Sequence, residues 1–283
     1  MQRKNLPTMA LRAAAATLLV LGPLAAVAVA TEPCDDFGEC KTIIEINATD
    51  GDIGFHFLMD GDDLLGARIF DPNGTKLFQD RATGPLAEQF LTETFAESAE
   101  PLCWDDPEAD PDEEIVTLTE FLDRWADGTY LFVGKGEDPG LAFGETDLTH
   151  ELPAAPQDVD FVAGVISWSA GDDLGNCATS AELDVLVADG DLPIHPQSVA
   201  VDSWEVVLEP DVESGDPTGD LKYSIRLPGD VSPMQVTVPA DYLASLPDDT
   251  PVKVEVGAFG GNDNATFSEA DGFCVNEVDG CEE

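Results

Sequence analysis

The sequence predicts a mainly β protein built from two β-sandwich-like domains in tandem, the first of which contains one short helix. Three observations support this fold class. Short segments in which apolar and polar residues alternate recur along the chain, separated by turns rich in Asp, Asn, Gly and Pro. A clear amphipathic-helix spacing occurs only near residue 120. Residues 152–156 hold two prolines and break the pattern, which is typical of a domain boundary.

The first domain is expected over residues 31–152, with strands separated by compact turns. Residues 71–74, Asp-Pro-Asn-Gly, predict a hairpin, because proline presets φ and glycine accepts a left-handed conformation. The Asp-rich residues 60–63 predict another turn, and the acidic, proline-rich residues 97–115 predict an exposed loop. The expected strands cover residues 41–47, 53–59, 65–70, 75–79, 90–95, 130–133 and 141–152.

The one clearly predicted helix begins after Thr117. Glu120 stands three residues later, so the two side chains can complete a capping box. Gly128 is the expected end signal, because glycine commonly follows the last helical residue. The apolar residues of this helix form one stripe, which consists of Leu118, Phe121, Leu122 and Trp125.

The second domain is expected over residues 153–270, followed by a cysteine-containing tail over residues 271–283. Its predicted strands cover residues 161–168, 203–209, 221–227, 234–238, 252–258 and 265–268. Strict alternation is clearest in Val252-Lys253-Val254-Glu255-Val256.

Three segments of this second domain resemble the fibronectin type III pattern. They are Trp168, Trp204-Glu205-Val206 and Val254-Glu255-Val256-Gly257-Ala258, which stand where that family has its second, third and sixth strands. The resemblance covers Pro153 to Glu269 and implies a sandwich that acts as a spacer or adhesion module. Residues 171–198 depart from the pattern as a long insertion, and valine replaces the usual tyrosine of the sixth strand. The whole chain also resembles uncharacterised exported bacterial proteins.

An export signal is expected over residues 1–30. Basic residues begin it, an apolar run follows from residue 13, and residues 28–30, Ala-Val-Ala, give the small-x-small pattern of a cleavage site. A retained membrane anchor is the alternative, which a Gly-Pro interruption and the lack of a stop-transfer pattern disfavour. The mature chain is therefore expected to be secreted or periplasmic.

The charge of the chain restricts its partners. It has 58 acidic and 12 basic residues, which give a net charge of −46 at pH 7. Nucleic acid and anionic membranes are excluded as ordinary partners. Three interpretations remain: a solvated acidic surface suited to high salt, carboxylates that bind calcium, and a docking surface for a basic partner. The first is favoured, because charge runs are usually solvated.

Six cysteines in an exported chain predict three disulfides. Fifteen pairings are possible for six cysteines. We favour two local loops and one bridge between the two halves of the chain. A zinc site is the rival, which the lack of a C-x-x-C motif disfavours. The favoured pairs are Cys34–Cys40, Cys103–Cys177 and Cys274–Cys281.

Calcium is the cofactor that the sequence allows, although none is required. Two Asp-rich turns could converge at one edge of a sandwich and supply the oxygen ligands that Ca²⁺ prefers. Neither turn has the EF-hand spacing. The candidate metal ligands are Asn47, Asp50, Asp52, Asp60, Asp62 and Asp63.

No catalytic residue is assigned. Neither G-x-S-x-G nor H-E-x-x-H occurs, and His56, His150 and His195 are scattered, with His56 expected on a strand surface. Trp104, beside a cysteine, is interpreted as a cap over a disulfide, or alternatively as a platform on which a sugar or peptide stacks.

The function that fits these features is a secreted, non-catalytic binding, adhesion or structural module with a protein or carbohydrate ligand. The alternative is a calcium-stabilised accessory domain of a cell-surface assembly. A hydrolase that uses acidic residues is a weaker alternative, because 58 acids place some pair at catalytic separation in any fold.

Overall fold

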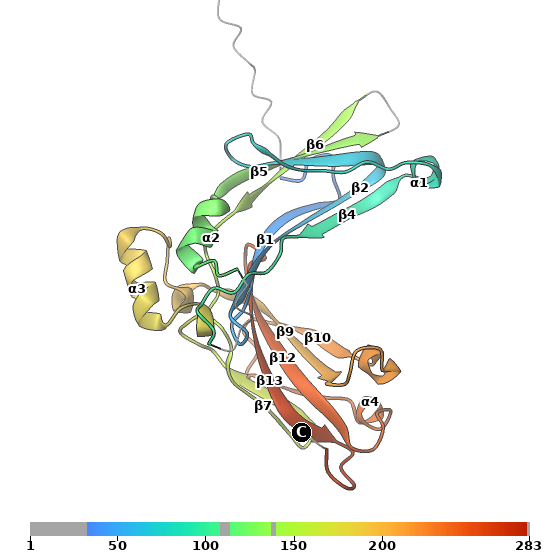
Figure 1. Cartoon of the computed structure of the whole chain (residues 1–283), viewed down its shortest axis with the longest axis vertical. Coiled ribbons are helices and arrows are strands. Elements are labelled where there is room, and N and C mark those ends of the chain that lie inside the picture. Colours follow the sequence, from blue (N-terminus) through green and yellow to red (C-terminus); the bar gives the residue numbers. More distant parts are fainter. Residues whose placement is uncertain (1–32, 108–113, 137–139, 282–283) are drawn as a thin grey trace, which may run out of the picture. The chain divides into compact units, whose positions relative to one another are not determined.

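The computed structural model describes residues 33–281, apart from residues 108–113 and 137–139. The expected export signal lies outside the described residues. Within them the protein is mainly β, with strands in two sheets of ten and three strands (Figure 1). None of the described helices is long and apolar enough to cross a membrane.

The N-terminal elements form one side of the large sheet. Strand β2 lies beside β1 and is the longest strand of this group (Figure 1). The elements are β1 (Glu39–Asn47), β2 (Asp52–Phe70), β3 (Lys76–Gln79), α1 (Pro85–Gln89), β4 (Leu91–Glu97), α2 (Leu118–Arg124), β5 (Gly128–Gly136) and β6 (Leu141–Leu148).

The C-terminal elements complete the large sheet and form the small one. They are β7 (Gln157–Val162), β8 (Val165–Ser169), α3 (Ser180–Asp189), β9 (Val201–Pro210), β10 (Tyr223–Pro228), β11 (Gln235–Thr237), α4 (Ala240–Leu243), β12 (Thr250–Gly260) and β13 (Ala265–Val275). Three short 3₁₀ turns occur at Gly175–Cys177, Pro196–Ser198 and Pro217–Asp220. The large sheet has the order β10-β9-β12-β13-β1-β2-β5-β6, with β3 and β4 also on β2, and the small sheet has the order β11-β8-β7.

The turn predicted at residues 60–63 is wrong, because β2 runs through it as one strand. The first part of β2 pairs with β1 and β4, and the second part pairs with β5 and β3. Each part is therefore held by its own neighbours, and the Asp-rich segment is accommodated as an irregularity in register, with Asp63 at φ 55°. The predicted hairpin at residues 71–74 is confirmed, with Gly74 at φ 78° and its N–H donating to Asp71 O at 2.9 Å.

Helix α2 confirms the predicted capping box. Thr117 and Glu120 each accept a hydrogen bond from the other's backbone N–H. The end predicted from Gly128 is wrong: the helix ends at Arg124, where the N–H of Trp125 donates to Phe121 O at 3.0 Å, and Gly128 begins β5. Tertiary contact with the sheet fixes this end, since the Trp125 ring stacks on Phe55 with centroids 3.9 Å apart.

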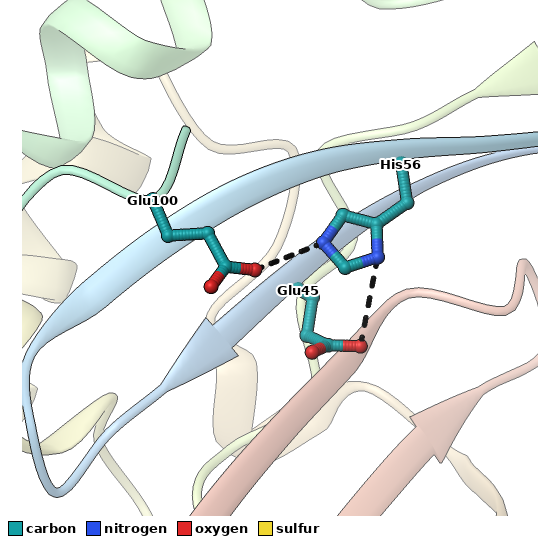
Figure 2. A group of neighbouring side chains, drawn as sticks. All are labelled: Glu45, His56 and Glu100. Carbon is teal, nitrogen blue, oxygen red and sulfur yellow. Dashed lines mark hydrogen bonds and ion pairs between the residues drawn. The ribbon is translucent and has the colours of Figure 1, made fainter. Parts of the chain in front are cut away.

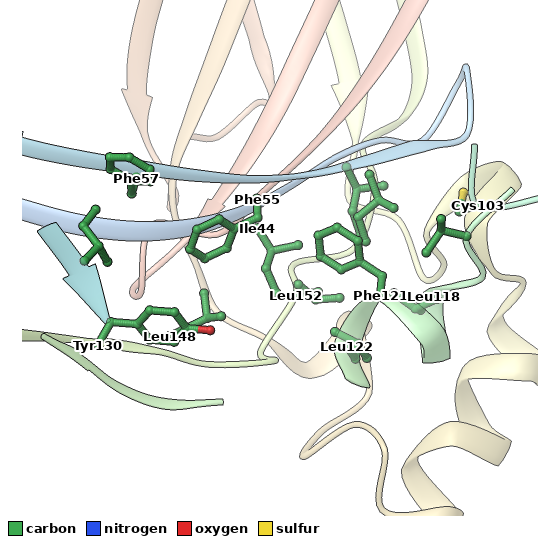
Figure 3. Packing of buried hydrophobic residues seen from close by; sticks show 14 of the residues in the cluster. Ile44, Phe55, Phe57, Cys103, Leu118, Phe121, Leu122, Tyr130, Leu148 and Leu152 are labelled. Atoms are coloured by element: carbon green, nitrogen blue, oxygen red, sulfur yellow. The ribbon is translucent and has the colours of Figure 1, made fainter. Parts of the chain in front are cut away.

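The first core cluster lies between the N-terminal strands and helix α2 (Figure 3). Ile44 and Phe55 come from the sheet, and Phe121 and Leu122 come from the helix. Leu183 of α3, in the stretch expected as an insertion of the second sandwich, joins this same cluster. The hydrophobic pattern alone does not show which of two cores such a helix covers.

The second core cluster lies between the two sheets and makes the C-terminal part a sandwich. Trp168 of the small sheet packs against Trp204 of the large one, with ring centroids 5.8 Å apart. Val254 and Val256 of β12 are fully buried in the same cluster. This is the sandwich that the alternating pattern predicted.

The stretch over residues 152–156 is buried rather than exposed. Leu152 belongs to the first core cluster, Ala155 N–H donates to Asp173 O at 2.8 Å, and Pro153 O accepts from Thr266 Oγ1 at 2.7 Å. The large sheet also continues across the chain through the parallel pairing of β1 with β13. A domain boundary at residues 152 and 153 stays a prediction.

All three favoured disulfides are present. Their Cα–Cα separations are 5.3, 5.0 and 5.7 Å, in the normal range for a disulfide. Three disulfides indicate a protein of an oxidising, non-cytoplasmic compartment. The bonds are Cys34–Cys40, Cys103–Cys177 and Cys274–Cys281.

Candidate functional site

One face of the large sheet gathers acidic side chains, and we call it the acidic face. Strand alternation explains it, because successive side chains point to opposite sides of a sheet. Glu45 lies between the core residues Ile44 and Ile46, and Glu255 lies between the core residues Val254 and Val256. Register places the members opposite or next to one another. The acidic face consists of Glu45, Asp52, His56, Glu97, Glu205, Glu209, Lys253, Glu255, Phe259, Phe267 and Glu269, with Glu100 reaching it from the segment after β4.

At the N-terminal end of this face, Glu45, His56 and Glu100 converge. His56 Nε2 lies 3.1 Å from Glu100 Oε1, and His56 Nδ1 lies 4.0 Å from Glu45 Oε2. Figure 2 shows the two carboxylates on different sides of the imidazole ring. His56 is only 8% exposed, whereas the Glu100 side chain is 42% exposed.

The backbone places Glu100 with precision beside the ring. Ser98 N–H donates to Phe55 O at 2.8 Å, and Ile53 N–H donates to Pro101 O at 3.2 Å. The segment is therefore fastened to β2 on both sides of Glu100. Gly54 supplies the space, because a Cβ there would lie 2.9 Å from His56 Nε2 and from Glu100 Cγ.

Negative charge accumulates around this group. Burial raises the pKa of Glu45; His56 opposes this shift, while Glu100, Glu97 and Glu205 add to it. Burial, together with Glu100 and Asp50, raises the pKa of Asp52 to about 7. The carboxylates therefore stand in one another's field, which favours uptake of a proton or a cation.

The C-terminal end of the acidic face is partly neutralised. Lys253 Nζ lies 3.0 Å from Glu269 Oε2 and 3.3 Å from Glu209 Oε1. Burial, then Glu269 and Glu209, nevertheless raise the pKa of Glu255 to about 7. Lys222 also pairs with Glu209, yet these cations do not keep the pKa of Glu255 at its ordinary value.

An arginine shows how this face holds a guanidinium group. Arg226 of β10 forms an ion pair with Glu205 and lies over the ring of Phe259, 3.9 Å from its centroid. The Phe259 ring meets the edge of Phe267 at 5.5 Å, and Phe267 covers Gly257, where a side chain would collide with it. Acid and aromatic ring together form a good environment for a guanidinium group.

The two Asp-rich segments lie apart, so the convergence expected of them is wrong. Asp52 pairs with Asn47 at one end of the β1–β2 ladder, and Asp60 pairs with Glu39 at the other end. The continuity of β2 separates the two groups. The residues of the first group are Asn47, Asp50 and Asp52, and those of the second are Asp60, Asp62 and Asp63.

In the first Asp-rich turn, the side-chain oxygen of Asn47 already accepts two hydrogen bonds. Asn47 Oδ1 accepts from Thr49 N–H at 3.0 Å and from Asp50 N–H at 3.2 Å, which is the pattern of an Asx turn. Calcium binding at either turn stays a prediction.

Trp104 packs on the turn that precedes β2. Its Nε1–H donates to Asp50 O at 3.0 Å, and its indole fills the space above Gly51, where a Cβ would meet it at 2.2 Å. Cys103 N–H donates to Gly51 O at 2.7 Å, so the tryptophan lies beside the Cys103–Cys177 bridge. A role in sugar or peptide stacking stays a prediction.

Sequence reasoning missed the group at His56. Alternation placed His56 opposite the core phenylalanines, and this is right, but it did not show that the ring is buried on the other side. Glu100 lies in the stretch expected as an exposed loop, 44 residues away. The other two histidines bond elsewhere: His150 Nε2 lies 2.8 Å from Trp125 O, and His195 Nε2 lies 3.3 Å from Ser180 O.

Comparisons with known proteins give no family. No protein-family model and no curated protein matches the sequence. A tetra-tandem repeat from the extending region of a large adhesion protein is 13% identical, with a TM-score of 0.26, over 83% of this chain and 50% of that one, so the chain spans about half of that structure. The human OSCAR ligand-binding domain is 11% identical, with a TM-score of 0.23, over 83% and 98% of the two chains. TM-scores this low do not show a shared fold.

Proposed function

We propose that this chain is a secreted or periplasmic, non-catalytic binding module whose acidic face binds a cationic segment of a protein partner. One observation supports this above the others: burial and crowding raise the pKa of Glu45, Asp52 and Glu255 on a single face. A ligand that brings positive charge would relieve this repulsion and gain a complementary surface.

Arg226, which belongs to this chain, indicates the chemistry of the partner. Arg226 uses the acid of Glu205 and the ring of Phe259 together. A partner rich in arginine can repeat this arrangement along the face, because a guanidinium both stacks on rings and pairs with carboxylates. An arginine-rich peptide should therefore bind more tightly than a lysine-rich peptide of equal charge.

Titration calorimetry with an arginine-rich peptide at pH 8 tests the proposal. Glu97 and Glu255 belong to the acidic face and form none of the ion pairs described for it, so the double variant E97Q/E255Q should weaken binding roughly tenfold, as expected for removal of two close charges. The matched control is E88Q/D184N, which removes two exposed charges on α1 and α3. Equal weakening in both variants would mean that the peptide responds only to net charge.

A further inference from the structure

We propose that Glu45, His56 and Glu100 form a binding site for a divalent transition-metal ion, with Zn²⁺ as the best-matched ion. The inference does not depend on the proposed function, because it concerns one imidazole and two carboxylates and not the whole face. The proposed zinc ligands differ from the residues of the two Asp-rich segments that the sequence suggested for calcium.

The donor atoms suit zinc. An imidazole nitrogen and carboxylate oxygens are ordinary Zn²⁺ ligands, at about 2.0–2.2 Å, so two ligands of one ion lie roughly 3–3.5 Å apart. His56 Nε2 and Glu100 Oε1 are 3.1 Å apart, and one ligand atom from each of the three residues lies within 4.8 Å of the others. Glu45 Oε2 lies nearer the other ring nitrogen, 4.0 Å from Nδ1, so the Glu45 side chain would have to rotate toward Nε2 to join the same ion. Calcium prefers an all-oxygen shell, so the histidine selects against it.

The backbone around His56 and Glu100 fixes the positions of these two residues. His56 is held in a β-strand that pairs on both sides, with Ile43 of β1 and with Glu97 of β4, and its ring is almost fully buried. Two backbone hydrogen bonds fasten the segment on either side of Glu100. Gly54 leaves free the space in which His56 and Glu100 meet. The protein therefore holds two of the three ligands in place before an ion arrives.

The surroundings of these three side chains are negatively charged, which favours a dication. Glu97 and Glu205 add negative charge around Glu45, and no lysine or arginine forms an ion pair with Glu45 or Glu100 among the described residues. A bound Zn²⁺ would bring two positive charges to this place, and three protein ligands would leave coordination positions for water or for an outside ligand.

Titration of the oxidised protein with Zn²⁺, monitored by calorimetry at fixed ionic strength, tests the site. We expect one Zn²⁺ bound per chain in a step that Ca²⁺ at a hundredfold excess does not displace. H56Q should abolish this step. Because His56 is buried and its variant can fail to fold, E100Q at an exposed position is the second variant. Loss of even an outer-shell partner of a metal costs roughly 10–100-fold in affinity, so loss of this ligand should weaken binding at least tenfold.

Two controls separate this site from adsorption to an acidic protein. H195Q removes a histidine outside the site, and D184N removes an exposed carboxylate of α3, so both should bind zinc as the wild type does. Co²⁺ should give visible absorption bands that E100Q alters. Zinc binding that is absent in the wild type, unchanged in E100Q, or equally displaced by Ca²⁺ would overturn the proposal. Peptide binding can persist in any of these cases, so the two proposals fail separately.

Discussion

Gly54 decides whether His56 and Glu100 can meet, although it carries no functional group. Its backbone is not in the left-handed region, so alanine is compatible with its conformation, and only space is at issue. Such a position shows why a site can be invisible in a sequence: a glycine within an alternating strand gives no sign that a loop from residue 98 onward crosses it.

G54A should separate the two side chains. The added Cβ would lie 2.9 Å from His56 Nε2 and Glu100 Cγ, so Glu100 must withdraw and zinc affinity should fall at least tenfold. Zinc titration measures this loss. G140A is the matched control, because Gly140 has open space around its Cβ direction. Unchanged zinc binding in G54A would show that the close contact is not needed.

Glu255 predicts a specific pH dependence of stability. Its pKa is about 7 in the folded protein against an ordinary value of 4.5, so the folded state binds the proton more tightly. Stability present below about pH 4.5 is therefore lost as the pH rises to about 7. E255Q keeps a neutral group there and should raise the Tm relative to wild type more at pH 8 than at pH 5.

Thermal unfolding at the two pH values measures this difference. D184N, which removes a charge on the exposed face of α3, should show a much smaller dependence on pH. A gain in Tm for E255Q that is equal at pH 5 and pH 8 would contradict the raised pKa.

At the scale of elements, the sequence predicts features that depend on neighbouring residues, but not those that depend on tertiary contacts. The hairpin at residues 71–74 and the capping box at Thr117 depend on neighbouring residues, and the sequence shows both. The Asp-rich segment at residues 60–63 reads as a turn, yet β2 continues because different strands hold its two parts. The two turns proposed for calcium consequently lie at opposite ends of a ladder. The long-range contact of His56 with Glu100 had no local signal.

Thr117 should contribute measurably to the stability of α2. T117A removes the N-cap and should cost about 1 kcal/mol, which is a decrease of roughly 2–4 °C in Tm. Thermal unfolding gives the value. T119A, two residues later within the helix, should change the Tm far less, since Thr119 is not the cap. Equal losses in the two variants would mean that the capping bonds contribute little.

At the scale of the whole molecule, one disulfide joins distant parts of the chain. Cys103–Cys177 spans 74 residues, whereas Cys34–Cys40 and Cys274–Cys281 span 6 and 7. Restriction of the unfolded chain grows with loop length. The long bridge also holds the segment before α3 beside the first core cluster, which includes Leu183.

Removal of the long bridge should be the most damaging. C103S/C177S should lose about 4 kcal/mol of stability, against about 2 kcal/mol for C34S/C40S, by the dependence on loop length. Denaturant unfolding of the two double variants compares them directly. A larger loss in C34S/C40S would contradict this assignment of the main covalent constraint.

The acidic face is the feature on which the account of function depends. Mapping of backbone amide shifts by NMR, during titration with an arginine-rich peptide, tests it most directly. Shifts should concentrate on β1, β2, β4, β9, β12 and β13 and should saturate together. Shifts that spread evenly over the acidic surface, α3 included, or that concentrate away from these strands would contradict it.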